Sequence, residues 1–352
     1  MVKKTTHMTV KDVAEKAGVS PSTVSRVISN HPKISEETKE KVLKIMDELG
    51  YYPNAIARSL ASKKTGTIGV ILPNRSEDLL LNPFFPEALR GILKGAAAFG
   101  YDVLLSTSTE GKNEMEIVKT FIRSSKVDGI VLMSSSVGDE SQAYLNNIDF
   151  PYSLIGSPYD HKERVNHVDN DNYMAAYELT TYLSMIGRKR IALIAGEIGQ
   201  MVTMKRVEGY QKALMESNIP YDEHLLFTGK FDEETGYTYG AAILDMTPRP
   251  DAIIITDDLI AFGAVKVFQG AGVRIPEDMA IASFNNSILS RYSDIPLTSV
   301  EINSFELGYE SVNLLVQSID QGVRGNKVII PYTIVKRQST EGHDPLLPSP
   351  VS

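Results

Sequence analysis

The chain has 352 residues, of which 42% are hydrophobic and 23% are charged, a balance typical of globular proteins. It has no run of about 18 apolar residues that could span a membrane. No apolar signal core follows its polar N-terminus. The sequence contains no cysteine, which excludes disulfides and thiolate zinc sites. We therefore expect a cytoplasmic protein with no membrane partner.

The charge is unevenly distributed along the chain. The net charge is −8, but residues 1–64 carry 12 Lys or Arg against 7 Asp or Glu, whereas the remainder carries 24 against 37. A basic head on an acidic body is expected when only the head meets phosphate. Solvated helix faces also carry local excesses, so charge alone does not identify a nucleic-acid partner.

Capping signals predict two short helices near the N-terminus. Thr9 with Asp12 three residues later forms a capping-box pattern, and Gly18 ends the first helix. Ser20 can cap the second helix, with Pro21 in the favoured first position. The residues expected to face inward are Val10, Val13, Ala14, Ala17, Val24, Val27 and Ile28.

A third helix is predicted from about Ser35 to Leu49, with Val42, Ile45 and Met46 on its apolar stripe, and Gly50 ends it. Two short helices joined by a tight turn indicate a helix-turn-helix domain over residues 1–50. The alternative is a three-helix interaction module with no nucleic-acid partner.

The exposed face of the second helix favours DNA. It carries Pro21, Ser22, Ser25, Arg26 and Ser29. Short hydroxyls permit close approach to the DNA backbone, and one arginine can read guanine bidentately. A generic solvated helix would more often carry Glu and Lys here.

The remainder of the chain alternates predicted strands and helices, which indicates an α/β fold of parallel sheets covered by helices. About 275 residues of this pattern favour two doubly wound lobes over one. The predicted strands are Ile68–Leu72, Val103–Leu105, Ile130–Met133, Ser153–Ile155, Ile191–Ala195, Ala252–Ile255 and Met279–Ala282.

Ligands of such folds bind at the carboxyl ends of strands, between the lobes. The side chains that we expect there are polar or aromatic, the types that hold sugar hydroxyls and stack on a sugar ring. They include Phe84, Phe85, Arg206, Phe231, Asp257 and Asn285. Structural roles are the alternatives: Asp257 or Asp258 must cap the helix from Leu259, with Asp258 the better candidate, the asparagines can form a turn, and the phenylalanines can be core residues.

Catalytic and metal-binding signals are missing. The sequence has no Gly-x-Ser-x-Gly elbow, P-loop or dinucleotide fingerprint, and its six histidines lack metal-ligand spacing. We therefore expect a binding protein without cofactor or metal rather than an enzyme.

Several segments resemble the heads of the LacI/GalR family of bacterial repressors: Val10–Ala14, Ala17–Ser20, Thr23–Val27 and Gly50–Leu60. The resemblance continues to about Thr340. It implies base contacts by Pro21, Ser22 and Arg26, and backbone contacts by Ser20, Thr23 and Asn54. It also implies a hinge helix within residues 51–64 that enters the minor groove, with Ala57 beside a wedging Leu60.

For the body, the resemblance implies two lobes of periplasmic-binding-protein type joined by three crossovers. The first lobe would comprise residues 65–163 and 301–325, and the second residues 164–300 and 326–340. Arg206, Asp257 and Asn285 match positions that bind sugar hydroxyls, and Phe231 matches a stacking position. The stretch Asn82–Phe85 together with Phe231 is most similar to the family's maltose-regulator branch.

The resemblance implies a homodimeric repressor that reads a pseudo-palindromic operator and responds to a small-molecule sugar. Residues 341–352 lack leucine heptads, so we expect a disordered tail and a dimer rather than a tetramer. One alternative is a catabolite-control regulator with a protein corepressor. That branch has arginines around the segments that Ile295 and Asn313 occupy here, and their absence argues against this partner. The other is a sugar-binding protein with a non-DNA head.

Overall fold

The computed structural model describes residues 8–28, 31–51, 64–73, 79–107, 113–160 and 163–341. The chain divides into an N-terminal unit, whose described residues form three helices, and a larger unit from Thr67 onward that contains two sheets. Across the described ranges, none of the helices combines the length and apolarity needed to cross a membrane.

Local capping positions the helices of the N-terminal unit, α1 (Val10–Ala17), α2 (Pro21–Ile28) and α3 (Glu36–Glu48). The Asp12 carboxylate accepts the Thr9 backbone N–H at 2.7 Å, and Ser20 Oγ accepts the Thr23 N–H at 3.1 Å. Gly18 ends α1 with a φ of 64°, in the left-handed region that glycine adopts without strain. The three predicted helices are therefore confirmed. Their buried core consists of Val13, Ala14, Ala17, Val24, Val27, Val42, Ile45 and Met46.

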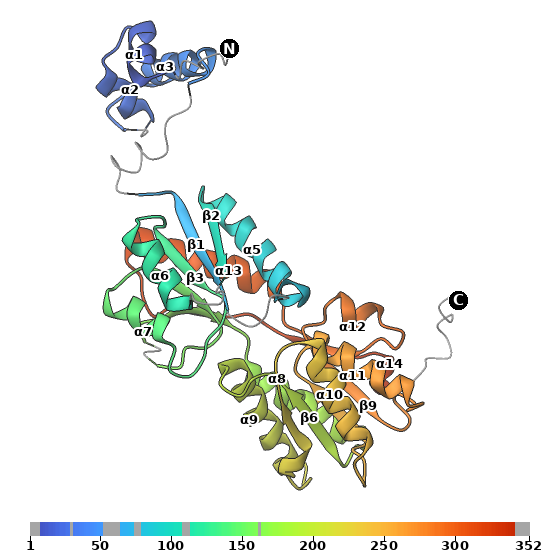
Figure 1. Cartoon of the computed structure of the whole chain (residues 1–352). Coiled ribbons are helices and arrows are strands. Elements are labelled where there is room, and N and C mark those ends of the chain that lie inside the picture. The colour runs from blue at the N-terminus through green and yellow to red at the C-terminus, as the bar shows by residue number, and fades with distance from the viewer. Residues whose placement is uncertain are drawn as a thin grey trace. The chain divides into compact units, whose positions relative to one another are not determined.

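The first lobe of the larger unit contains a six-stranded parallel sheet of order β11-β5-β4-β3-β1-β2. Its strands β3, β1 and β2 lie side by side in Figure 1. Its central strands are apolar and buried, as expected of a parallel sheet covered on both faces. The strands are β1 (Thr67–Leu72), β2 (Asp102–Thr107), β3 (Gly129–Leu132), β4 (Tyr152–Ile155), β5 (Asn166–Asp169) and β11 (Lys327–Ile329).

The second lobe contains a sheet of order β12-β10-β9-β8-β6-β7, in which only β12 runs antiparallel to its neighbour. The predicted α/β class with two parallel-sheet lobes is thus confirmed. The strands are β6 (Ile191–Ala195), β7 (Leu226–Thr228), β8 (Ala252–Ile255), β9 (Ala280–Phe284), β10 (Thr298–Glu301) and β12 (Thr333–Val335).

Helices cover both sheets, and several pack in close pairs: α5 with α13, α8 with α9 and α10 with α11. Glycines permit this approach. A Cβ on Gly209 of α9, for example, would lie 2.1 Å from the carbonyl oxygen of Tyr173 on α8. First-lobe helices are α5 (Phe84–Ala98), α6 (Glu114–Arg123), α7 (Glu140–Asn147) and α13 (Ser304–Gln321). Second-lobe helices are α8 (Asn172–Met185), α9 (Met201–Glu216), α10 (Glu233–Leu244), α11 (Asp258–Gly270), α12 (Ile288–Tyr292) and α14 (Gln338–Glu341).

Two strands lie in a different lobe from the one expected. Residues 164–300 and 326–340 were assigned to the second lobe, but β5 pairs with β4 and β11 pairs with β5, so both strands extend the first sheet. The chain therefore crosses between the lobes after Asp169 and after Ile329 rather than before these strands.

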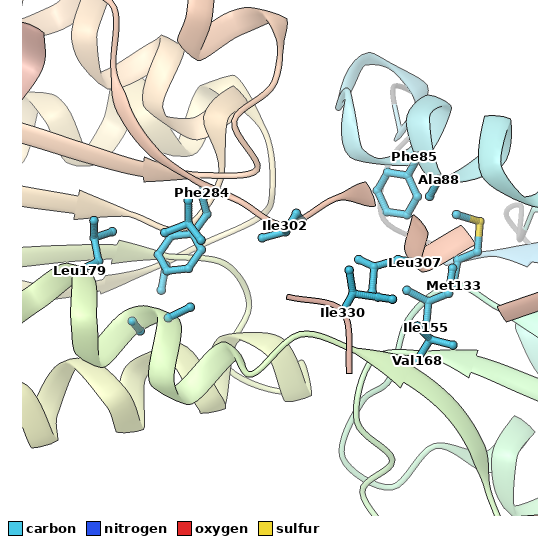
Figure 2. Close-up of a cluster of buried hydrophobic side chains, with 14 of the residues drawn as sticks. Phe85, Ala88, Met133, Ile155, Val168, Leu179, Phe284, Ile302, Leu307 and Ile330 are labelled. Atoms are coloured by element: carbon cyan, nitrogen blue, oxygen red, sulfur yellow. The ribbon is translucent and has the colours of Figure 1, made fainter. Parts of the chain in front are cut away.

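One side chain connects the three crossover segments. Asn170 on the first crossover donates from Nδ2 to the carbonyl oxygens of Ile302 at 3.0 Å and Ile330 at 2.9 Å. Figure 2 shows Ile302 between the apolar group around Phe284 and the group that contains Phe85. The hinge is therefore a single hydrogen-bonded junction with apolar side chains on both sides.

Candidate functional site

The surface predicted to read DNA is exposed on the N-terminal unit. The exposed residues are Ser20, just before α2, and Pro21, Ser22 and Arg26 on the helix; Thr23 is half-buried. The Ser20 hydroxyl contacts the hydroxyls of Ser22 at 2.7 Å and Thr23 at 2.9 Å. This part of the helix thus presents a short, polar surface with one arginine, while its apolar residues face the core. Of the other predicted DNA contacts, Asn54, Ala57 and Leu60 lie outside the described residues.

A cavity between the two lobes of the larger unit brings together all six residues proposed from the sequence to bind an effector. The first lobe supplies Phe84 and Phe85, from the start of α5. The second lobe supplies Arg206, Phe231, Asp257 and Asn285. Apart from Arg206, which lies in the second turn of α9, these second-lobe residues lie in loops or at a helix start beyond the carboxyl ends of β7, β8 and β9. The cavity volume is about 90 Å³.

Arg206 is held almost entirely within the second lobe. It is 4% exposed, its Nε donates to Asn172 Oδ1 at 2.9 Å and its Nη1 donates to the Thr256 carbonyl at 2.6 Å. The guanidinium also lies 4.0 Å from the centre of the Phe284 ring. These contacts fix the plane of the guanidinium, so its remaining N–H groups keep fixed directions.

Asp257 and Asp258 differ from the sequence expectation. Asp257, rather than Asp258, caps α11: its Oδ1 accepts the Leu259 N–H at 2.8 Å while the side chain also lines the cavity. Asp258 is buried and accepts the Ser283 hydroxyl at 2.5 Å and the Ser287 N–H at 2.6 Å. A residue can cap a helix only from the position just before its first turn, and α11 begins one residue earlier than expected.

The second oxygen of Asp257 accepts hydrogen bonds from two side-chain amides. Asn285 Nδ2 donates to it at 2.9 Å, and Asn82 Nδ2 donates at 2.8 Å from the first lobe. Asn285 has a φ of 93° and Asn286 a φ of 45°, a left-handed turn that asparagine tolerates better than most residues. The turn suggested by these asparagines is therefore present, and it directs Asn285 at Asp257.

Aromatic rings supply the apolar part of the cavity. Phe84 and Phe85 lie edge to face with ring centres 5.1 Å apart, and Phe85 is only 3% exposed. Phe231, which precedes α10, packs over Gly196, where a Cβ would lie 2.0 Å from the ring. Phe84 and Phe85 therefore have both of the roles considered for them, because each lines the cavity and also packs against the hydrophobic core.

The cavity also contains polar residues that the sequence reasoning missed. Asp169 ends β5, and Asn170 and Asn172 come just after it; the apolar pattern does not reveal this strand, because it has a single aliphatic residue. The sequence signal for these residues is the polar run Asp169–Asn172. It indicates a strand-end cluster only once β5 is identified as a strand. The other missed polar lining residues are Ser134, Ser135 and Gln200.

Burial dominates the electrostatics of the cavity. It raises the pKa of Asp169 and that of Asp257 to about 6, and it raises the pKa of Asp258. Burial also lowers the pKa of Arg206 to about 10, against the opposing effect of these three carboxylates. Arg206 therefore stays charged at neutral pH and partly balances the negative charge around it.

This arrangement suits polar recognition. It offers a fixed guanidinium, carboxylate and amide groups, and phenylalanine rings within one small cavity, as sites for polyhydroxylated ligands require. Among the residues that the structure describes, no cluster of three or more His, Asp or Glu side chains could hold a metal ion.

Comparisons with known proteins agree with both units. Residues 9–54 match the family model of bacterial regulatory proteins, lacI family, and residues 180–340 match that of the periplasmic binding protein-like domain. The HTH-type transcriptional regulator MalR of Streptococcus pneumoniae is 37% identical over 339 residues, which cover 95% of this chain and 99% of the relative.

Two solved structures extend the similarity. The lac repressor dimer bound to operator and the anti-inducer ONPF aligns with a TM-score of 0.81 at 26% identity, over 95% of this chain and 99% of the other. A complex of the transcriptional regulator CelR with cellobiose aligns with a TM-score of 0.74 at 30% identity, covering 94% and 99%. The chain belongs to the lacI family of bacterial regulatory proteins and is a DNA-binding transcriptional regulator rather than an enzyme.

Proposed function

We propose that this regulator is a sugar-responsive repressor of a carbohydrate-utilisation operon, and that it is released from DNA by a maltose-type α-glucoside. The observation that carries the proposal is the cavity that Arg206, Asp257, Asn285 and Phe231 line together. The names of two similar proteins support a sugar as effector, since one is a MalR regulator and the other was solved with cellobiose.

In this proposal the protein is a cytoplasmic homodimer, because a pseudo-palindromic operator presents two half-sites related by a two-fold axis. Pro21, Ser22 and Arg26 contact bases, while Ser20, Thr23 and Asn54 contact the backbone. Ala57 and Leu60 enter the minor groove at the operator centre. The lac repressor dimer on its operator supports this arrangement by analogy.

The size of the cavity bears on how a disaccharide would enter. Its volume of about 90 Å³ is well below the roughly 300–1,000 Å³ of typical small-molecule sites. An α-glucoside therefore does not fit the cavity in this conformation, and in this proposal the lobes separate to admit it and close again around it.

A gel-shift titration with the DNA upstream of the chain's own gene tests the proposal, with maltose, cellobiose and glucose added in turn. We expect binding that weakens steeply with salt and that maltose abolishes. The Arg26→Ala variant should lose discrimination between operator and mismatched DNA, costing about 1–3 kcal/mol at one base pair. Lys11→Ala, on α1, is the matched control: it removes a charge outside the base-reading set and should weaken all sequences alike if it matters at all.

Each failure has a distinct meaning. Operator binding that is strengthened by a purified phosphorylated carrier protein and unaffected by sugars would favour the catabolite-control alternative. Negligible DNA binding even at low salt would favour a sugar-binding protein with a non-DNA head. Linkage supplies an internal check. If the sugar lowers the affinity for operator by some factor, operator must lower the affinity for the sugar by the same factor.

A further inference from the structure

Among the described residues, two sets of hydrogen bonds join the lobes across the cavity. On one side the contacts are between backbones: the Met201 N–H donates to the Ser135 carbonyl at 3.0 Å and the Val137 N–H donates to the Gly199 carbonyl at 2.9 Å. On the other side a side chain makes the contact, from Asn82 Nδ2 to Asp257 Oδ2 at 2.8 Å. Only the second contact depends directly on the identity of two side chains.

Asn82 is rigidly held by the first lobe. Its Oδ1 accepts the Phe84 N–H at 3.0 Å, and its backbone carbonyl accepts the Phe85 N–H at 3.2 Å. The residue is 3% exposed. Because its oxygen is committed to the start of α5, its amide nitrogen has one available direction, towards the second lobe.

Asp257 is equally constrained within the second lobe. One oxygen caps α11 through Leu259, and the other accepts Asn285 in addition to Asn82. An ionised carboxylate can accept about four hydrogen bonds, so a position remains for a ligand hydroxyl. A bound sugar therefore has no need to displace Asn82.

We propose that Asn82 is a latch residue: its hydrogen bond to Asp257 holds the first lobe against this cavity-lining carboxylate and sets the ratio of closed to open clefts. A charged acceptor in a buried site makes this bond stronger than a neutral one. If closed clefts bind effector, the latch also sets effector affinity, because affinity scales with the competent fraction. That last consequence rests on the proposed function, whereas the latch itself does not.

The absence of native cysteine allows a direct measurement. Spin labels on Lys94→Cys of α5 and Glu208→Cys of α9, both exposed, report the distance between the lobes by pulsed electron resonance. Labelled chains are mixed with excess unlabelled chain to suppress signals between subunits. The informative variant is Asn82→Asp, which keeps an oxygen for the Phe84 N–H but replaces the donor with a second carboxylate.

We expect Asn82→Asp to lower the closed-to-open ratio at least about tenfold, the loss expected for one hydrogen bond to a charged group. The control is Asn166→Ala. Asn166 is a buried asparagine that bonds Val323 and Asn326 within the first lobe. It should lower thermal stability without changing the distance distribution. A swap of Asn82→Asp with Asp257→Asn reverses donor and acceptor and should restore part of the closed population.

Three results would overturn the latch: an unchanged distribution in Asn82→Asp, an equal shift in Asn166→Ala, or a swap no more closed than Asn82→Asp alone. None of them involves sugar or DNA. Failure of maltose and other sugars to release operator would refute the proposed function while the label distances still decide the latch.

Discussion

The buried carboxylate of Asp257 makes a quantitative prediction about stability and pH. Burial raises its pKa from 3.8 to about 6 in the folded protein. Between these values the folded state binds more protons at Asp257 than the unfolded state, so the contribution of Asp257 to the stability of the parent falls as pH rises through this window and is constant above it. At 1.36 kcal/mol per pKa unit, the full loss is about 3 kcal/mol.

The Asp257→Asn variant removes the titrating group but keeps a residue that caps helices equally well. It carries a pH-independent cost, because one of its polar contacts is reversed. Its free energy of unfolding relative to the parent should nevertheless rise with pH, by about 2 kcal/mol between pH 4.5 and 7, where most of the window lies.

Urea titrations followed by circular dichroism at several pH values measure this difference. The control is Asp278→Asn, on the surface beside Arg274, because hydrogen bonds from Arg274 lower the pKa of Asp278 to about 2. Its effect on stability should change only below about pH 4. A difference between Asp257→Asn and the parent that stays constant from pH 4.5 to 7 would refute the assignment of a raised pKa.

Further predictions concern packing, a buried hydroxyl and a helix cap. Gly209→Ala forces a Cβ against the Tyr173 carbonyl and should lower the free energy of unfolding by about 1–3 kcal/mol or more, whereas Gly270→Ala, with nothing within 4 Å, should be neutral; thermal melts of both variants compare them. Tyr210→Phe removes a hydroxyl that donates to the Ile191 carbonyl at 2.8 Å and should cost about 1 kcal/mol in urea unfolding; an unaltered midpoint would contradict that. Ser35→Ala removes the side chain that accepts the Thr38 N–H at the start of α3, and should cost the isolated N-terminal unit about 1 kcal/mol of helical stability by circular dichroism.

Elements that are set by local signals are those that the sequence predicts correctly. The caps at Thr9, Ser20 and Ser35 act within one turn of their own helices, so the N-terminal unit could be derived almost completely. Continuous apolar runs likewise identify the central strands β1, β3, β6 and β8, which are buried on both faces.

Elements that depend on distant partners could not be predicted in this way. The strand β5 has the sequence Asn-His-Val-Asp, and its burial comes from pairing with β4 and with β11, which lies far along the chain. For the same reason the positions of the crossovers, and with them Asn170, were missed. Asp257 shows a related limit, since a one-residue difference in a helix start exchanges the roles of two adjacent carboxylates.

The interlaced path of the chain has a consequence for its synthesis. The N-terminal unit draws its core from residues 13–46 and has every residue it needs once that segment has left the ribosome. The first lobe, by contrast, waits for α13 and β11, so its sheet stays incomplete until residues near 329 emerge. Nascent chains therefore expose a finished helix-turn-helix long before the lobes that regulate it can fold, and pairing of such distant segments is intrinsically slow.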